Sequence, residues 1–147
     1  MKICIVSSSG GHLTEIKQLA SVYEAYSYFY VINYLVPLDP EMRAKTMFIT
    51  HSERDFRFFI NLYEAYKILK KERPNAILSC GAGPAVPFAL VGRALFGTRV
   101  IFIETITRVK RPSLTGRIMY RLAHVFYYQW APLKQYYPKG IYAGPLV

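Results

Sequence analysis

Residues 2–12 read KICIVSSSGGH, an apolar and β-branched run that meets a turn of small residues and then a histidine. The apolar part is typical of a buried strand, and a helical pattern of apolar residues begins directly after the turn, near Leu13. A strand–turn–helix unit of this kind gathers unpaired backbone N–H groups at the start of a helix, where a phosphate can bind. The segment therefore predicts an anion cradle at residues 9–11 with the titratable side chain of His12 at its rim.

The rest of the chain continues this alternation of apolar strands and helices. Strands are expected at residues 2–6, 28–34, 47–50, 76–79, 99–104, 125–129 and 141–143, and helices at 13–23, 56–71, 85–96, 114–122 and 132–136. Most strands are continuous apolar runs, which predicts a parallel sheet covered on both faces. Since 147 residues fit one domain, we expect a single Rossmann-like, doubly wound α/β domain over residues 1–147.

Two helices carry more detailed expectations. Glu15, in the first turn of the first helix, would favour the positive end of the helix dipole. The inward apolar stripe of helix 56–71 is expected at Phe59, Leu62, Tyr63, Tyr66 and Leu69.

Charge is distributed unevenly along the chain. Nineteen Lys and Arg face nine Asp and Glu, and the only acid after Glu72 is Glu104. The acid-free stretch 105–147 carries Arg108, Lys110, Arg111, Arg117, Arg121, Lys134 and Lys139. A basic, aromatic surface suits a phosphate-bearing membrane, a nucleic acid or an acidic partner, and a solvated face with no partner is the plain alternative. Because no nucleic-acid recognition motif is present, charge alone predicts only weak, salt-sensitive nucleic-acid binding.

The cysteines and the hydropathy of the chain indicate its cellular location. Cys4 and Cys80 have no zinc-ligand spacing, so a reduced cytoplasmic compartment is the simplest account and no metal or cofactor is expected. No signal peptide precedes the first strand, and residues 85–106 are interrupted by charges and glycine. Membrane contact is therefore expected to be peripheral.

Ligands of doubly wound sheets bind outside the carboxyl ends of the strands. Three features should meet there: the turn at residues 9–12, the loop Gly81-Ala82-Gly83, and Glu104 with the basic loop 108–111 behind it. These strands are expected to be neighbours near the switch point of the sheet, so loops far apart in sequence would line one cleft.

Each feature also has a purely structural explanation. Gly10 and Gly11 could serve only a tight turn, and Gly81 could serve helix–strand packing, although two glycine loops at corresponding strand ends favour a ligand cleft. Glu104 could be an acid paired with nearby cations. His12 could bond the backbone, but beside an anion cradle it is a candidate general base, with a reference pKa of ~6.5.

A dinucleotide site fits the sequence poorly. Gly10 and Gly11 are adjacent, which is not the G-x-G-x-x-G spacing, and Asn33-Tyr34-Leu35 supplies no acid at the end of the second strand. A phosphate-binding G-x-x-x-x-G-K-[ST] loop is also missing, and Cys80 has no histidine in a pairing motif that would make it a nucleophile.

Several motifs recur together in one order: residues 8–14 (SSGGHLT), 79–83 (SCGAG), 102–104 (FIE), 113–117 (SLTGR), 129–130 (QW) and 137–139 (YPK). Together they resemble the oligosaccharide-biosynthesis family. This family contains the bacterial PssD and CpsF capsule and exopolysaccharide proteins. It also contains the eukaryotic membrane-side subunit of the dolichol-linked N-acetylglucosaminyltransferase.

The resemblance implies a split glycosyltransferase, in which this chain is the acceptor-side, N-terminal half of a GT-B enzyme such as MurG. A separate subunit would hold the UDP-sugar, and the sugar would pass to a polyprenyl-diphosphate-linked saccharide at the cytoplasmic membrane face. His12 would be the base. The acceptor side would comprise Ser9, Gly10, Gly11, Gly81, Gly83, Glu104 and Arg108. The partner subunit would contact Gly144, Pro145, Leu146 and Val147, which look like the lead into a second GT-B domain.

Two other classes remain open. The chain could be a non-catalytic scaffold that recruits and enhances a complete transferase at the membrane. It could also be a nucleotide-dependent oxidoreductase, which the glycine spacing disfavours.

Overall fold

The computed structural model describes residues 1–33, 37–52 and 55–146. In this part of the chain, seven strands form one sheet in the order β3-β2-β1-β4-β5-β6-β7, and every neighbouring pair is parallel. The strands are β1 (Lys2–Ser7), β2 (Ser27–Ile32), β3 (Thr46–Phe48), β4 (Ala76–Cys80), β5 (Arg99–Ile103), β6 (Val125–Tyr128) and β7 (Ile141–Tyr142). Each expected strand is confirmed to within two residues, apart from Tyr34, which lies outside the described residues.

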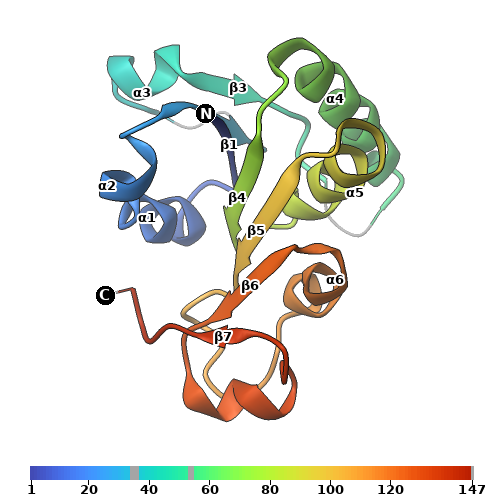
Figure 1. The fold of residues 1–147 in the computed structure, drawn as a ribbon. Helices are drawn as coiled ribbons and strands as arrows, with labels where there is room; N and C mark the ends of the chain where they lie inside the picture. Colours follow the sequence, from blue (N-terminus) through green and yellow to red (C-terminus); the bar gives the residue numbers. More distant parts are fainter. Residues whose placement is uncertain (34–36, 53–54, 147) are drawn as a thin grey trace.

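Helices lie on both faces of this sheet (Figure 1). Three short ones cover one face: α1 (Gly11–Lys17), α2 (Ala20–Tyr23) and α3 (Pro40–Ala44). Three longer ones cover the other: α4 (Arg57–Glu72), α5 (Ala85–Phe96) and α6 (Leu114–Leu122), and a short 3₁₀ turn, η1 (Ala131–Gln135), follows β6. The Rossmann-like, doubly wound fold is therefore confirmed.

The sheet separates two apolar cores, and successive side chains of the central strands contribute alternately to one core and to the other. In β1, Cys4 and Val6 pack with the α4–α6 layer, while Ile3 and Ile5 pack with the α1–α3 layer. Successive side chains of a strand point to opposite faces, so a strand buried on both faces is apolar at every position. The continuous apolar runs of the sequence follow from this.

Local signals fix the ends of the helices in the second layer. Ser113 caps α6, where its Oγ accepts a hydrogen bond from the Gly116 N–H at 2.8 Å. Gly97 ends α5 with a φ of 61°, the left-handed conformation that glycine adopts without steric cost. Both ends lie where the sequence predicts them.

The first expected helix, residues 13–23, is divided. It forms α1 and α2, separated by a tight turn in which the N–H of Gln18 and that of Leu19 bond the carbonyls three residues back. This turn brings Tyr23 into the core, where its hydroxyl lies 3.0 Å from that of Tyr30. Sequence analysis also missed α3, although Asp39 caps it and Pro40 occupies its first turn.

The expected inward stripe of α4 is partly wrong. Its buried residues are Asn61, Ala65 and Leu69, whereas Phe59 is 71 % exposed and Tyr63 is 62 % exposed. Asn61 takes the inward position because its amide donates to the Thr50 carbonyl at 2.8 Å and to Glu64 Oε2 at 3.0 Å. A buried amide with these partners is satisfied, so the helix turns its large aromatic rings outward.

Helices cover both faces as expected, but the coverage is unequal. The α1–α3 layer leaves a groove of about 620 Å³ over β1, β4, β5 and β6. Its walls are mostly apolar and include Ile101, Ile103 and Tyr127, together with Leu146 from the C-terminal segment.

None of the described helices combines the length and the hydropathy that a bilayer-crossing helix requires.

Candidate functional site

The chain order and the sheet order diverge beside β1, because β1 pairs with β2 on one side and with β4 on the other. The register aligns Val6 with Ser79 and Ser79 with Phe102, so β1, β4 and β5 end at one level. A cleft of about 600 Å³ opens at this edge. Its polar wall comprises His12, Ser52, Asp55, Gly81, Gly83, Thr105, Thr107, Arg108, Ser113 and Thr115.

His12 connects two of the three predicted loops at this edge. Its side chain is 32 % exposed and its ring lies against the β4–α5 loop at Gly81. A Cβ built on Gly81 would approach Cε1 of His12 to 2.9 Å and Cβ of Thr105 to 2.8 Å. Gly81 also has a φ of 79°. A glycine is therefore required here for two reasons, the positive φ of the backbone and the close approach of the imidazole.

We predict that Gly81→Ala displaces His12 and destabilises the domain. The added methyl meets the imidazole and the Thr105 side chain, and the positive φ adds strain, so unfolding should become easier by about 1–3 kcal/mol. Thermal unfolding measures the loss, and the imidazole resonances of His12 report the displacement. Gly83→Ala is the matched control, because a Cβ there meets nothing within 4 Å. Equal unfolding temperatures for the two variants would contradict the close packing of His12 on Gly81.

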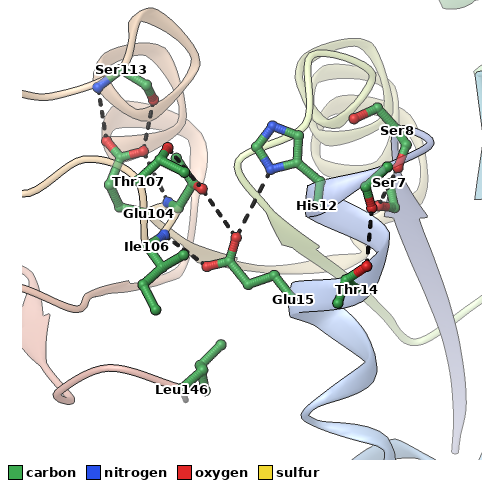
Figure 2. Close-up of polar contacts among 12 residues, drawn as sticks. Ser7, Ser8, His12, Thr14, Glu15, Glu104, Ile106, Thr107, Ser113 and Leu146 are labelled. Carbon is green, nitrogen blue, oxygen red and sulfur yellow. Dashed lines mark hydrogen bonds and ion pairs between the residues drawn. The ribbon is translucent and has the colours of Figure 1, made fainter.

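Glu15 is a central site residue that sequence analysis misjudged. Sequence analysis places it in the first turn of the helix, but α1 begins at Gly11 and its first turn holds no acid. Glu15 is 5 % exposed, and its carboxylate lies between His12 and the β5–α6 loop (Figure 2). Oε1 accepts from the Ile106 N–H at 2.8 Å, and Oε2 accepts from the Thr105 hydroxyl at 3.0 Å. Oε2 also lies 4.0 Å from Nδ1 of His12.

This geometry gives the imidazole a defined orientation. Nδ1 of His12 is buried and makes no hydrogen bond with the described residues, and the Glu15 carboxylate faces it at 4.0 Å. The other ring nitrogen points away from Glu15 (Figure 2). A carboxylate facing one imidazole nitrogen favours the proton on that nitrogen and leaves the other nitrogen free to accept one.

Gln129, which the sequence shows only as part of a family motif, joins the site to the C-terminal segment. Its side chain is 1 % exposed, and its amide nitrogen donates to Glu15 Oε1 and to the Glu104 carbonyl. Its amide oxygen accepts from the Leu146 N–H at 2.9 Å. One buried amide therefore fixes α1, the end of β5 and the C-terminal segment relative to one another.

The expectation that Glu104 faces the cleft is wrong. Its side chain is 0 % exposed and accepts hydrogen bonds from the Thr105 N–H, from both the N–H and the hydroxyl of Ser113, and from the Tyr137 hydroxyl. These donors satisfy the carboxylate internally and fasten the start of α6 to β5. Burial, together with the contact with Glu104, raises the pKa of Tyr137.

The other predicted acceptor-side residues lie either in the cleft wall or in the turn before His12. Gly83 and Arg108 line the cleft, and Arg108 is exposed. Ser9, Gly10 and Gly11 form the β1–α1 turn that leads into His12, and the Gly10 carbonyl accepts the first two N–H bonds of α1.

Of the predicted partner residues, Gly144 and Leu146 line the apolar groove on the α1–α3 face rather than the cleft. Pro145 is exposed between them, and Val147 lies outside the described residues.

The two cysteines do not supply a nucleophile. Cys4 and Cys80 are buried and unpaired, and burial raises the pKa of each thiol far above its ordinary value. Both therefore stay neutral near pH 7, and a neutral thiol is a poor nucleophile. Among the described residues, no group of His, Cys, Asp and Glu side chains is arranged to hold a metal ion.

Fold and site together define a class: a parallel α/β domain with a polar cleft at the switch point of the sheet, the place where doubly wound domains bind ligands. Solved structures of this shape include a UDP-GlcNAc 2-epimerase of Methanocaldococcus jannaschii crystallised with UDP-GlcNAc and UDP. It has a TM-score of 0.77 at 14% identity, over 99% of this chain and 47% of that one. MurG of Acinetobacter baumannii has a TM-score of 0.70 at 16% identity, over 89% of this chain and 42% of that one. The chain thus spans less than half of each, and the likeness is one of fold.

The chain belongs to the family described as "Oligosaccharide biosynthesis protein Alg14 like", which matches residues 41–146. Similar proteins include the UDP-N-acetylglucosamine transferase subunit ALG14 of Mus musculus, 27% identical over 100% of this chain and 83% of the relative. The subunit of the same name from Homo sapiens is 28% identical over the same shares. The family resemblance that the motifs indicate is therefore confirmed.

Proposed function

We propose that this chain is the acceptor-binding, membrane-side subunit of a two-subunit glycosyltransferase. The enzyme would move a sugar from a UDP-sugar to a polyprenyl-diphosphate-linked saccharide at the cytoplasmic face of the membrane. N-acetylglucosamine is the first sugar to test, because the named relatives are UDP-N-acetylglucosamine transferase subunits. The observation that carries the proposal is His12, held against Gly81 and Glu15 at the wall of the switch-point cleft.

In this mechanism His12 is the general base. Its outward-facing ring nitrogen takes the proton of the acceptor hydroxyl while that oxygen forms a bond to the anomeric carbon of the donor. The bond from that carbon to the UDP oxygen breaks, and UDP leaves with the electron pair. Glu15 keeps the proton of the neutral imidazole on Nδ1, which leaves the other nitrogen available.

The cleft also offers groups that suit the acceptor diphosphate. The first residues of α6, Leu114 and Thr115, line the cleft, as does Gly83 just before α5, and Arg108 adds an exposed guanidinium. Backbone N–H groups at helix starts and a guanidinium are suited to phosphate oxygens. The turn at Gly10 and Gly11 would approach the same diphosphate from the His12 side.

The apolar groove on the α1–α3 face is the surface we assign to the donor-binding subunit. Its walls are mainly apolar, and Gly144 and Leu146 form part of it. Apolar area of this kind is rarely left open in a domain that works alone. Through Gln129, the same segment contacts Glu15, so docking of a partner there would be mechanically linked to the base.

A three-way assay tests the proposal. The purified chain, the separately purified donor-binding subunit and their mixture are each given labelled UDP-N-acetylglucosamine and a polyprenyl-diphosphate saccharide. Only the mixture should transfer label to the lipid at an appreciable rate, and no cofactor should be needed. Full activity of this chain alone would refute the two-subunit arrangement. Full activity of the other subunit alone on a soluble acceptor would make this chain a scaffold.

A further inference from the structure

Helix α4 presents an unusual outer face. Phe56 precedes it at 71 % exposure, and Phe59 (71 %), Ile60 (41 %) and Tyr63 (62 %) follow at spacings of three and four residues. Residues at these spacings fall on one side of a helix. Large aromatic side chains so exposed are costly in water, and here they form a continuous stripe rather than scattered single residues.

The basic and acidic residues near this stripe differ in their exposure. The basic residues of α4 and its ends are all exposed: Arg57, Lys67, Lys70, Lys71 and Arg73. Lys67 lies over the ring of Tyr63, at 5.6 Å, and Lys70 over the ring of Tyr66, at 5.5 Å.

The acids of α4 are engaged by the protein itself. Glu64 accepts hydrogen bonds from the backbone and the hydroxyl of Thr50, and Glu72 pairs with Lys2. Asp55, just before the helix, faces Arg57 at 3.8 Å. The α4 face therefore offers aromatic rings among cations, a combination that matches the boundary between lipid headgroups and acyl chains.

The stripe is continuous with the cleft. Phe59 belongs to both the exposed stripe and the cleft wall, where it is joined by Leu114 and Ile118 from the start of α6. Leu114 is 48 % exposed and Ile118 is 39 % exposed, so the apolar surface continues from α4 to the mouth of the cleft. Figure 1 shows α4, α5 and α6 on one side of the sheet, opposite α1 and α2.

We propose that the α4 face, residues 56–70, rests on an anionic membrane surface and turns the mouth of the cleft toward the lipid. The aromatic rings and Ile60 enter the headgroup boundary, and Lys67 and Lys70 contact lipid phosphates. This orientation rests on the proposed function in one respect: the carrier chain of a lipid-linked acceptor can then stay in the bilayer while its diphosphate reaches His12. Sequence analysis names a membrane as one of several partners that the acid-free stretch 105–147 would suit, whereas the exposed aromatic rings of this face lie earlier in the chain.

Vesicle binding tests this assignment without any sugar transfer. The intact chain is sedimented with phosphatidylcholine vesicles, with and without phosphatidylglycerol, and should bind the anionic vesicles more strongly. The triple variant F56S/I60S/Y63S should bind the anionic vesicles about tenfold more weakly, or weaker still, as measured by its partition coefficient. The matched control is V109S/Y136S/I141S, which removes three exposed apolar side chains from the stretch 105–147 and should bind like the parent.

Unfolding temperatures of both variants should match that of the parent, because the substituted side chains are exposed. Binding of the α4 variant at parental strength, or an equal loss in the control variant, would overturn the assignment. Equal binding to neutral and anionic vesicles would also overturn it, because the cations of the face would then play no part. Absence of binding to either kind of vesicle would overturn it too, and would point instead to a protein partner for this face. Vesicle binding that depends on α4, together with a mixture of both subunits that transfers no sugar, would refute the proposed function and leave the membrane surface standing.

Discussion

Replacement of His12 by alanine should lower the rate of sugar transfer by about 10²–10⁴-fold in the assembled enzyme, the range typical of a lost general base. The imidazole is the titratable group that lies at the cleft wall with a carboxylate behind it, Glu15 at 4.0 Å. Turnover is measured with saturating donor and acceptor, so that a change in kcat is separated from a change in KM.

Thr14→Ala is the matched control for His12→Ala. Thr14 lies on the same short helix and is exposed, and its hydroxyl donates a long, 3.4 Å hydrogen bond to the Gly10 carbonyl. The Thr14→Ala enzyme should turn over at close to the parent rate, and both variants should remain folded. Near-parental turnover of His12→Ala would remove the histidine from the catalytic role.

Of the glycine-to-alanine substitutions in this chain, Gly116→Ala should cause the largest loss of stability. A Cβ at this position would lie 1.9 Å from Oε2 of Glu104 and 2.6 Å from the Tyr137 hydroxyl. Neither group can yield easily, because both are buried and bonded to each other. We expect a loss of about 3 kcal/mol or more, since the methyl both overpacks the core and breaks a buried hydrogen-bond network.

Thermal unfolding measures this loss, which corresponds to a fall in Tm of about 6–12 °C for a domain of this size. Gly11→Ala provides the comparison, because a Cβ there meets nothing within 4 Å and the residue begins a helix. It should leave Tm unchanged or slightly raised. Parental stability of Gly116→Ala would show that the buried carboxylate does not pack against Gly116.

The architecture was predictable because burial on both faces leaves a strong mark on sequence. Continuous apolar strands such as residues 76–80 and 99–103 permit few other arrangements, and Ser113 and Gly97 mark helix ends through local backbone chemistry. The position of the cleft followed from the topology alone, since β1 and β4 are neighbours at the switch point.

The polar interior could not be predicted in the same way. Glu104 and Glu15 are separated by most of the domain in sequence, and nothing local indicates that one is satisfied by Ser113 and Tyr137 while the other faces His12. The spacing of His12 and Glu15 was one signal that could have been used, because residues three apart on one helix place their side chains on one side.

The orientation of α4 was misjudged for a related reason. Periodicity identifies an apolar stripe but does not say whether protein or something else covers it, and a polar residue, Asn61, takes the inward face through its own hydrogen bonds. The apolar pattern of α4 and the observed burial of its side chains disagree, and this disagreement is the reason we propose the α4 face as an interaction surface.

The acceptor-side assignment is tested most directly by asking which substrate the isolated chain binds. Farnesyl-diphosphate-linked N-acetylglucosamine and UDP-N-acetylglucosamine are titrated separately while the His12 imidazole signals are followed by NMR. We expect the lipid-linked sugar to shift the His12 signals in a saturable way and UDP-N-acetylglucosamine at equal concentration to leave them in place. Saturable shifts with UDP-N-acetylglucosamine and none with the lipid-linked sugar would show that this chain holds the donor, which would contradict its assignment as the acceptor-binding subunit.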